Sequence, residues 1–350
     1  MRDRLLIYGA NGYTGELVAR LAQARGLRPI LAGRSAAVEA LARELELDAR
    51  LFALEEPAAL DRGLEAVKVV AHCAGPFSHT AKAMVDACLR GGAHYLDITG
   101  EALVFEALAA RDAEAKQRSV MLLPGAGFDV VPSDCLAAHL KRRLPRATRL
   151  TLAFQSRSGG LSRGTATTML ENMHNGVLVR RAGVLTRVPV AFKTRTIDFG
   201  RGPRSAMTIP WGDVATAYYS TGIPDIEVYV PARRRTILAL RLARPFLALT
   251  ALRPVRALFL RRIRARAPGP SAAARTRGRC FLWGEAQGAD GERVTARQET
   301  PEGYALTALT MVAIAERALK GDAPPGFMTP SKAYGPDFVL AIEGVTRQDL

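Results

Sequence analysis

The chain has 350 residues, a length that corresponds to about two domains of ordinary size. Hydrophobic residues make up 48% of the chain and charged residues 23%, proportions that exclude a disordered, collagen-like or coiled-coil protein. The four cysteines include no C-x-x-C pair and the five histidines show no metal-ligand spacing, so we expect a reduced, cytoplasmic protein without a metal. No run of about 18 apolar residues occurs, and the sequence therefore predicts no membrane-spanning helix.

The net charge of +16 is concentrated in one segment. Between residues 228 and 284 the chain carries 14 arginines and no lysine, aspartate or glutamate. The rest of the chain is therefore nearly neutral. The basic character is a local property of this segment and says little about the partners of the whole molecule.

The first candidate site follows the first predicted strand. Residues 4–8 form a short apolar run, the motif GANGYTG comes next, and apolar residues then recur at helical spacing to about residue 25. In such a unit the first glycine permits a tight turn, the second admits a pyrophosphate to the backbone, and the third lets the helix pack on the strand. The alternative is an ordinary strand–turn–helix connection. The predicted cofactor-binding residues are Gly9, Asn11, Gly12, Tyr13, Thr14 and Gly15.

The end of the next predicted strand indicates which dinucleotide binds. NAD-binding proteins place an acidic residue about 20 positions beyond the glycines, where it accepts a hydrogen bond from the ribose 2′-hydroxyl. This chain has Arg34 and Ser35 there instead, and no acid before Glu39. Because a guanidinium pairs with a 2′-phosphate, we expect NADP(H) as the cofactor, bound in part by Arg34 and Ser35.

Strands and helices alternate regularly through the first 123 residues. This pattern predicts an α/β fold with a Rossmann-type doubly wound parallel sheet, followed by a second α+β domain. The expected strands are 28–32, 50–53, 67–73, 95–98 and 120–123, and the expected helices are 38–47, 79–90 and 103–116.

Three loops that follow strands contain unusual sequences. Because the carboxyl ends of parallel strands share one edge, we expect these loops to meet near the nicotinamide end of the cofactor. The predicted catalytic candidates are Asp97, Glu101 and Asp129, although each could instead cap a helix or anchor a loop. The further predicted cofactor-binding residues are Ala74, Gly75, Pro76, Phe77, Gly127 and Phe128.

The motifs of these loops resemble those of the saccharopine dehydrogenase-like oxidoreductases, and most closely the subgroup described as trans-acting enoyl reductases. The similar segments cover nearly the whole chain. They are GANGYTG (9–15), AGRS (32–35), AGPF (74–77), YLDITGE (95–101), GAGFDVVPSDCLA (125–137), PWGDVATAYYSTGIPDIEVY (210–229), TPEGYALTALT (300–310) and FMTPSKAYG (327–335).

The resemblance implies an NADP-binding domain followed by a substrate domain, with a C-terminal return to the first domain. We place the NADP-binding Rossmann domain at residues 1–145, joined again by 322–350. The substrate and dimerisation domain then occupies 146–321, and a homodimer through its sheet is a possible assembly.

The second half of the chain has weaker patterns. A strand is expected at 148–157, a helix from about Thr165, and further β-like runs at 188–196 and 227–230. A loop carrying arginines before a helix could hold a phosphate or carboxylate, which makes Arg163, Thr165 and Met169 the substrate-binding candidates. The alternative is a plain surface connection with solvated arginines.

The segment 233–266 combines leucines at helical spacing with arginines and two prolines. The prolines predict separate helical pieces, and the apolar stripe with arginines predicts peripheral contact with a membrane surface. The alternative is a surface helical hairpin with solvated arginines. Nucleic acid is disfavoured as a partner, because only Phe246 and Phe259 could stack on bases.

These observations favour an NADPH-dependent oxidoreductase that reduces an enoyl C=C bond of an apolar lipid- or polyketide-type substrate, free or carrier-bound. A saccharopine-type C=N reductase is one alternative, since the same cofactor serves both reactions. A non-catalytic dinucleotide-binding, membrane-associated module is another.

Overall fold

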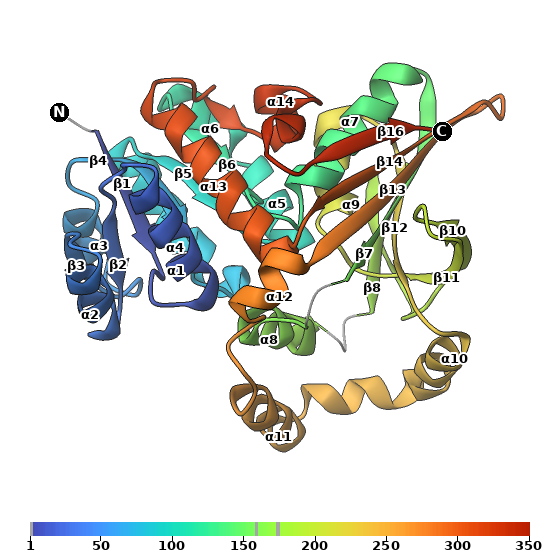
Figure 1. Cartoon of the computed structure of the whole chain (residues 1–350), viewed down its shortest axis with the longest axis horizontal. Coiled ribbons are helices and arrows are strands. Elements are labelled where there is room, and N and C mark those ends of the chain that lie inside the picture. The colour runs from blue at the N-terminus through green and yellow to red at the C-terminus, as the bar shows by residue number, and fades with distance from the viewer. Residues whose placement is uncertain (1–2, 158–159, 173–175) are drawn as a thin grey trace. The chain divides into compact units, whose positions relative to one another are not determined.

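The computed structural model describes residues 3–157, 160–172 and 176–350, which divide into two compact units (Figure 1). The first unit comprises Met1–Val131 and Tyr304–Tyr334, and the second comprises Pro132–Gly303 and Gly335–Leu350.

These boundaries differ from the expected ones at 145 and 322. Helix α7 (Val131–Arg143) falls in the second unit except for its first residue, whereas helix α13 (Gly303–Leu319) falls in the first unit except for its first residue. The last strand, β16 (Thr346–Asp349), pairs with a strand of the second unit. The C-terminal return to the first unit therefore ends at Tyr334.

The first unit is built on a parallel sheet of seven strands in the order β15-β6-β5-β4-β1-β2-β3. The order reverses between β1 and β4, which is the switch point of a doubly wound sheet, and right-handed crossovers then place helices on both faces (Figure 1). This confirms the predicted Rossmann-type fold. The strands are β1 (Arg4–Tyr8), β2 (Ile30–Gly33), β3 (Ala49–Leu51), β4 (Val67–His72), β5 (His94–Asp97), β6 (Met121–Leu123) and β15 (Gly326–Phe327).

The central strands of this sheet are buried on both faces, which explains their continuous apolar sequences. Leu6 and Ile7 of β1 are fully buried, and helix α1 turns Val18 and Ala22 toward the core. The remaining helices of the unit are α1 (Tyr13–Ala24), α2 (Ala37–Glu44), α3 (Pro57–Gly63), α4 (Phe77–Gly91), α5 (Ala102–Ala109), α6 (Asp112–Gln117) and α14 (Pro330–Tyr334).

The single helix expected at 103–116 is wrong, because the chain forms α5 and α6 there with a turn between them. The amide of Arg111 donates to the carbonyl oxygen of Leu108 at 3.0 Å in this turn. Asp112 then starts the second helix, and its carboxylate accepts a hydrogen bond from the Phe327 amide at 2.8 Å. A long-range contact with β15 therefore helps to fix the break, and no local periodicity reports such a contact.

The second unit contains a mixed sheet of nine strands. Its main path runs β10-β11-β12-β7-β13-β14-β16, with β8 and β9 attached to β12. β7 pairs in parallel with β12 and antiparallel with β13, which confirms an α+β arrangement. The strands are β7 (Ala147–Ser156), β8 (Val177–Arg181), β9 (Val184–Val188), β10 (Thr194–Asp198), β11 (Pro203–Thr208), β12 (Asp225–Pro231), β13 (Arg279–Gly288), β14 (Arg293–Pro301) and β16.

The continuous strand expected at 188–196 is also wrong. β9 ends at Val188 and β10 begins at Thr194. Pro189 follows directly and has no amide hydrogen for a sheet ladder. Ala191 has φ of 53°, a left-handed conformation that cannot continue a strand.

The basic segment forms three helical pieces, as the prolines predict. They are α10 (Arg234–Ala243), the 3₁₀ helix η2 (Arg244–Ala251) and α11 (Arg253–Arg264), and Pro245 and Pro254 lie in the first turns of η2 and α11. The other helices of this unit are α8 (Arg163–Asn172), α9 (Asp213–Thr221), α12 (Ala272–Arg277) and η3 (Phe338–Ala341). Within the described ranges, no helix combines the length and apolar character needed to cross a bilayer.

Candidate functional site

The glycine turn lies at the carboxyl end of β1, beside the ends of β2 and β4. The amide of Gly9 donates to the carbonyl oxygen of Ala32 at 2.8 Å, which joins the turn to β2. Gly9 has φ of 80°, and a Cβ there would lie 2.9 Å from the Cβ of Ala74 in the loop after β4. Only glycine satisfies both conditions without strain, so the turn is held against its neighbours by backbone contacts.

Gly15 brings helix α1 against the same turn. A Cβ at this position would lie 2.2 Å from the carbonyl oxygen of Gly9. Gly12 is the N-cap of α1, and glycine has no side chain to occupy the space in front of the first-turn amides. The positive end of the helix dipole thus meets a backbone surface without side chains, which suits a pyrophosphate. The residues present therefore fit a dinucleotide.

Residues at the end of β2 lie close to this turn. Asn11 Oδ1 lies 3.6 Å from where a Cβ on Gly33 would be. The Arg34 side chain is exposed, and its Nη1 lies 3.9 Å from Oε1 of the equally exposed Glu55. Ser35 Oγ accepts a hydrogen bond from the Ala37 amide at 3.2 Å at the start of α2. Arg34 is thus an exposed cation at this edge of the sheet, whereas the Ser35 hydroxyl accepts a hydrogen bond at the start of α2.

Glu101 fixes the loop after β4. Its two carboxylate oxygens accept hydrogen bonds from the amides of Phe77 at 2.7 Å and Ser78 at 3.1 Å, in the first turn of α4. A carboxylate at a helix N-terminus satisfies amides that have no partner within the helix and interacts favourably with its dipole. Glu101 therefore positions the Ala74–Phe77 loop, whose Gly75–Pro76 peptide bond is cis.

Asp97 joins the loops after β5 and β6. Its Oδ1 accepts hydrogen bonds from the amides of Thr99 at 2.9 Å and Gly125 at 2.8 Å, and its Oδ2 accepts one from the Tyr95 hydroxyl at 2.7 Å. Complete burial raises the pKa of Asp97 to about 6, and these three hydrogen bonds limit the rise. The carboxylate thus has several protein donors that hold two loops in place.

Asp129 differs from the other two carboxylates. A Cβ on Gly100 would lie 2.7 Å from Asp129 Oδ2, so the aspartate side chain lies directly against the backbone of the YLDITGE loop. Among the described residues its carboxylate has no hydrogen-bond partner, and burial raises its pKa to about 7. Two loops predicted to meet at the sheet edge therefore do meet, around a carboxyl group that is readily protonated near neutral pH.

Helix α13 supports the loop that carries Asp129. Thr307 Oγ1 accepts a hydrogen bond from the Phe128 amide at 3.0 Å, and Thr310 Oγ1 donates to the carbonyl oxygen of Ala126 at 2.7 Å. A Cβ on Gly127 would lie 2.8 Å from Thr307 Cγ2. These two threonines were not among the predicted site residues, although the TPEGYALTALT motif contains both of them.

The three predicted substrate residues lie on α8 of the second unit. Arg163 Nε donates to the carbonyl oxygen of Arg266 at 2.8 Å. The Thr165 amide, in the first turn of α8, donates to Ser162 Oγ at 3.2 Å. Met169 is exposed. Arg163 and Thr165 thus have local structural contacts, and their assignment to substrate remains a prediction.

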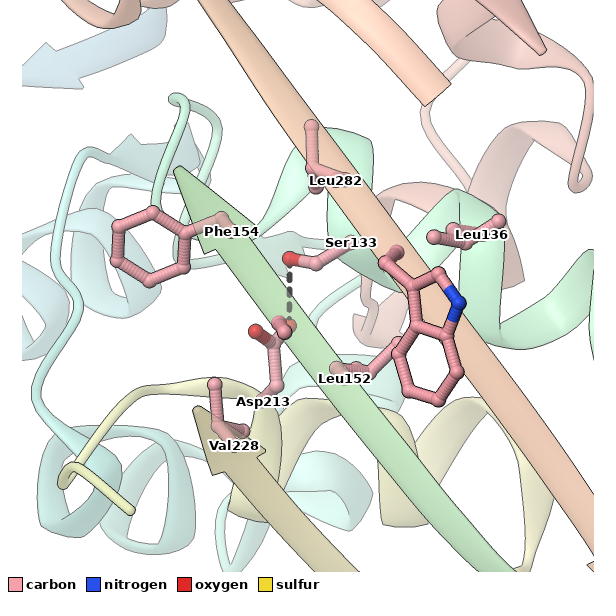
Figure 2. Close-up of a pocket in the computed structure, with 9 residues that line it drawn as sticks. Ser133, Leu136, Leu152, Phe154, Asp213, Val228 and Leu282 are labelled. Carbon is pink, nitrogen blue, oxygen red and sulfur yellow. Dashed lines mark hydrogen bonds between the residues drawn. The ribbon is translucent and has the colours of Figure 1, made fainter. Parts of the chain in front are cut away.

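A buried polar pair lies among apolar side chains of the second unit (Figure 2). Ser133 Oγ of α7 donates to Asp213 Oδ1 of α9 at 2.7 Å, beside Leu136, Leu152 and Leu282. The cavity here measures about 10 Å³, which is room for about one water molecule. The pair therefore joins two helices and does not form a substrate pocket.

A larger hollow of about 230 Å³ is strongly polar. Lys193 Nζ lies 2.5 Å from Glu227 Oε1, and Arg195 Nη2 lies 2.6 Å from Glu285 Oε1. Charged, paired side chains do not match an apolar acyl substrate. The lining residues are Arg149, Thr151, Lys193, Arg195, Glu227, Tyr229, Glu285 and Gln287.

The glycine turn, the strand order and its reversal between β1 and β4 define the first unit as a Rossmann-type dinucleotide-binding domain. Residues 5–123 match the family model described as the saccharopine dehydrogenase NADP binding domain. This part of the chain is therefore similar in sequence to that domain, and its cofactor is NADP(H), as the sequence predicts. Over the described residues, no group of three His, Cys, Asp or Glu side chains is arranged to hold a metal.

Curated relatives match a similar portion of the chain. A saccharopine dehydrogenase-like oxidoreductase of Mus musculus is 29% identical over 161 residues, which cover 40% of this chain and 38% of the mouse protein. A trans-acting enoyl reductase of Mycobacterium ulcerans is 32% identical over 149 residues, which cover 40% of this chain and 35% of that protein. The matched region thus spans less than half the length of either relative.

A solved structure shares the fold of the whole chain. It is the apo saccharopine dehydrogenase (L-Glu forming) of Saccharomyces cerevisiae, with a TM-score of 0.64 and 13% sequence identity. The superposition covers 99% of this chain and 100% of the yeast chain. The two units therefore have the fold of that enzyme.

Replacing Glu101 with alanine should lower the free energy of unfolding by about 1–2 kcal/mol, because two first-turn amides of α4 lose their acceptor. Glutamine should retain part of this stabilisation. Chemical denaturation measures the loss, and alanine at the exposed Glu65 is the matched control, expected to change stability by less than about 0.5 kcal/mol. Equal effects at the two positions would contradict a capping role for Glu101.

Asp129 should make stability depend on pH. Its folded pKa of about 7 lies above the usual value of about 3.9, so the folded protein binds an extra proton between these pH values. Unfolding free energy should therefore fall as pH rises through this window. Asp129→Asn should be about as stable as the wild type at pH 4 and more stable, by about 1 kcal/mol or more, at pH 8.

Thermal denaturation at the two pH values tests this expectation. Asp3→Asn, at an exposed aspartate, is the matched control and should show no such divergence. A constant difference between Asp129→Asn and the wild type across the range would mean that Asp129 titrates as an ordinary surface carboxyl.

Proposed function

We propose that this protein is an NADPH-dependent reductase that reduces the C=C bond of an apolar, enoyl-type acyl substrate. The observation that carries the proposal is Asp129, a readily protonated carboxyl group that lies against Gly100 at the carboxyl edge of the dinucleotide-binding sheet. Reduction of a polarised double bond needs a hydride at one end and a proton at the other. Asp129 is suited to supply the proton.

The residues of the site have two kinds of role, binding of the cofactor and positioning of the loops. The backbone of Gly9, Gly12 and Gly15 would hold the pyrophosphate, and the Arg34 guanidinium would bind the ribose 2′-phosphate. Glu101 and Asp97 are positioning residues, because their carboxylates hold the loops after β4, β5 and β6.

Bound NADPH would supply a hydride to the carbon β to the acyl carbonyl. The Asp129 carboxyl then donates its proton to the α carbon, which leaves a saturated acyl chain and an aspartate carboxylate. Solvent returns the proton before the next turnover. A protonated Asp129 is needed, so the rate should fall as the pH rises above its pKa of about 7.

Two observations support an apolar C=C substrate over a C=N substrate with several carboxylates. The trans-acting enoyl reductase of Mycobacterium ulcerans is named for enoyl reduction and is 32% identical over its matched region. A substrate with several carboxylates would need unpaired cations to bind it, yet Lys193 and Arg195 in the polar hollow are already paired with glutamates.

Arg34→Ala should weaken NADPH binding by about 10- to 100-fold and NADH binding far less, because only NADPH has a 2′-phosphate for the guanidinium. Fluorescence titration with both dinucleotides measures the two affinities. Glu55→Gln, which changes the carboxylate that lies near Arg34, is the control. Its affinity for NADPH should equal or exceed that of the wild type. Equal weakening of both dinucleotides in Arg34→Ala would contradict the assignment.

NADPH oxidation should be faster with enoyl thioesters such as crotonyl thioesters than with pairs of oxo acids and amines that form imines. Asp129→Asn should lower kcat by about a hundredfold or more and remove the fall in rate above pH 7, while NADPH still binds. Turnover of imine-forming pairs alone would contradict C=C reduction. A variant that keeps both the wild-type rate and its pH profile would contradict the role of Asp129.

A further inference from the structure

The helical segment 233–266, which we term the basic arm, has no part in the proposed reaction. It consists of α10, η2 and α11 of the second unit, which extend beyond the strands of the second sheet (Figure 1). Its sequence alternates apolar residues with arginines and contains no acidic residue. Its two sides differ sharply.

The inner side of the basic arm is attached to the second unit. Ile237 of α10 and Ile263 of α11 are buried. Arg241 Nε donates to the carbonyl oxygen of Ala191 at 3.1 Å, and Arg244 Nε donates to that of Val190 at 2.8 Å. Arg256 of α11 forms an ion pair with Glu171 of α8. These contacts fix which side of the arm faces the protein.

The outer side exposes large apolar side chains in a regular pattern. Leu238 and Leu242 are one turn apart on α10 and are 59% and 69% exposed. Phe246 and Leu249 of η2 are 66% and 49% exposed, and residues three apart share one face of a 3₁₀ helix. Leu258 and Phe259 continue the exposure on α11. The outer side is therefore an apolar stripe along three consecutive helical pieces.

Arginines that lack acidic partners accompany this stripe. Within the described part of the chain, the arginines at 233–235, 253, 261, 262 and 264 form no ion pair, in contrast to Arg256. Arg234 is one turn before Leu238, and Arg262 is one turn after Leu258, so cations share the faces of the exposed leucines. Unpaired guanidinium groups beside apolar side chains complement a surface whose outer layer is anionic and whose inner layer is apolar.

We propose that the basic arm binds the surface of a bilayer that contains anionic phospholipids. The leucines and phenylalanines enter the boundary between headgroups and acyl chains, and the arginines pair with lipid phosphates. A second copy of the arm is a poor occupant, because it would bring two sets of unpaired arginines together. A nucleic acid would contact the arginines but would leave the aliphatic stripe in water.

Sedimentation with vesicles tests the proposal on the whole chain described above. Vesicles of phosphatidylcholine with phosphatidylglycerol should bind the protein, and vesicles of phosphatidylcholine alone should bind it far less. Leu242→Asp with Phe246→Asp should reduce partitioning at least about tenfold. Val184→Asp with Leu161→Asp, at exposed apolar positions of the same unit outside the arm, is the matched control and should bind like the wild type.

A charge series separates the arm from the net charge of the protein. Arg261→Gln, Arg262→Gln and Arg264→Gln together should reduce partitioning to anionic vesicles about a hundredfold. The same triple change at the exposed Arg43, Arg118 and Arg293 removes equal charge and should have little effect. Circular dichroism checks that each variant remains folded, and all substituted side chains of both series lie on the surface.

Three results would overturn the proposal. The first is failure of the wild type to bind anionic vesicles, and the second is equal loss of binding in the arm variants and their controls. The third is binding to duplex DNA or RNA in the absence of vesicle binding. Such binding would fall steeply with salt and would persist in the double variant with aspartate at Leu242 and Phe246. Vesicle binding needs no NADPH, so its outcome is independent of the proposed reductase activity.

Discussion

The close approach of the Gly9 turn to its neighbours is the constraint on which the first unit depends. Three strand ends and one helix meet there through backbone atoms, with Ala32 as hydrogen-bond acceptor, Ala74 in contact and Gly15 on the helix side. A methyl group at Gly9 or Gly15 would collide with atoms that cannot move without displacing a strand. Because no side chain fits at these positions, the backbone there is exposed to a phosphate. Packing and ligand binding therefore both require glycine.

Three carboxylates at the edge of this sheet have different roles because they have different neighbours. Glu101 accepts from the first turn of α4, and Asp97 accepts from two amides and a hydroxyl. Glu101 holds the loop after β4, whereas Asp97 holds the loops after β5 and β6, on which Gly100 and Asp129 meet. Asp129 has no such donor among the described residues, and its burial raises its pKa, so the neutral form is favoured. Two carboxylates, Glu101 and Asp97, thus hold loops in place, whereas the third, Asp129, is available to exchange a proton.

Local sequence predicted six of the seven strands of the first unit, but not β15 or helix α3. Its apolar runs and glycine motif gave the strand boundaries to within about two residues, and the loops with Gly100 and Asp129 meet as strand polarity requires. The split between α5 and α6 could not be predicted from local sequence, because it involves Asp112 bonded to Phe327. The break between β9 and β10 was missed although Pro189 marks its start, and the left-handed conformation of Ala191, a residue that is not glycine, has no signal in the sequence. The support that Thr307 gives to the Asp129 loop spans 179 residues of sequence, a distance that no motif spacing measures.

The chain crosses between the two units at residues 131, 303 and 334, and this path has a consequence for how the protein is made. A ribosome releases β1 to β6 first, but β15 and the threonines of α13 that hold the loop before Asp129 emerge only after the whole second sheet except β16. Until β15 is synthesised, the edge of β6 that pairs with it has no strand partner, and the sheet of the dinucleotide-binding unit remains one strand short. The nascent N-terminal portion must therefore wait through the synthesis of more than 170 residues, from Pro132 to Gly303, before its last strand arrives.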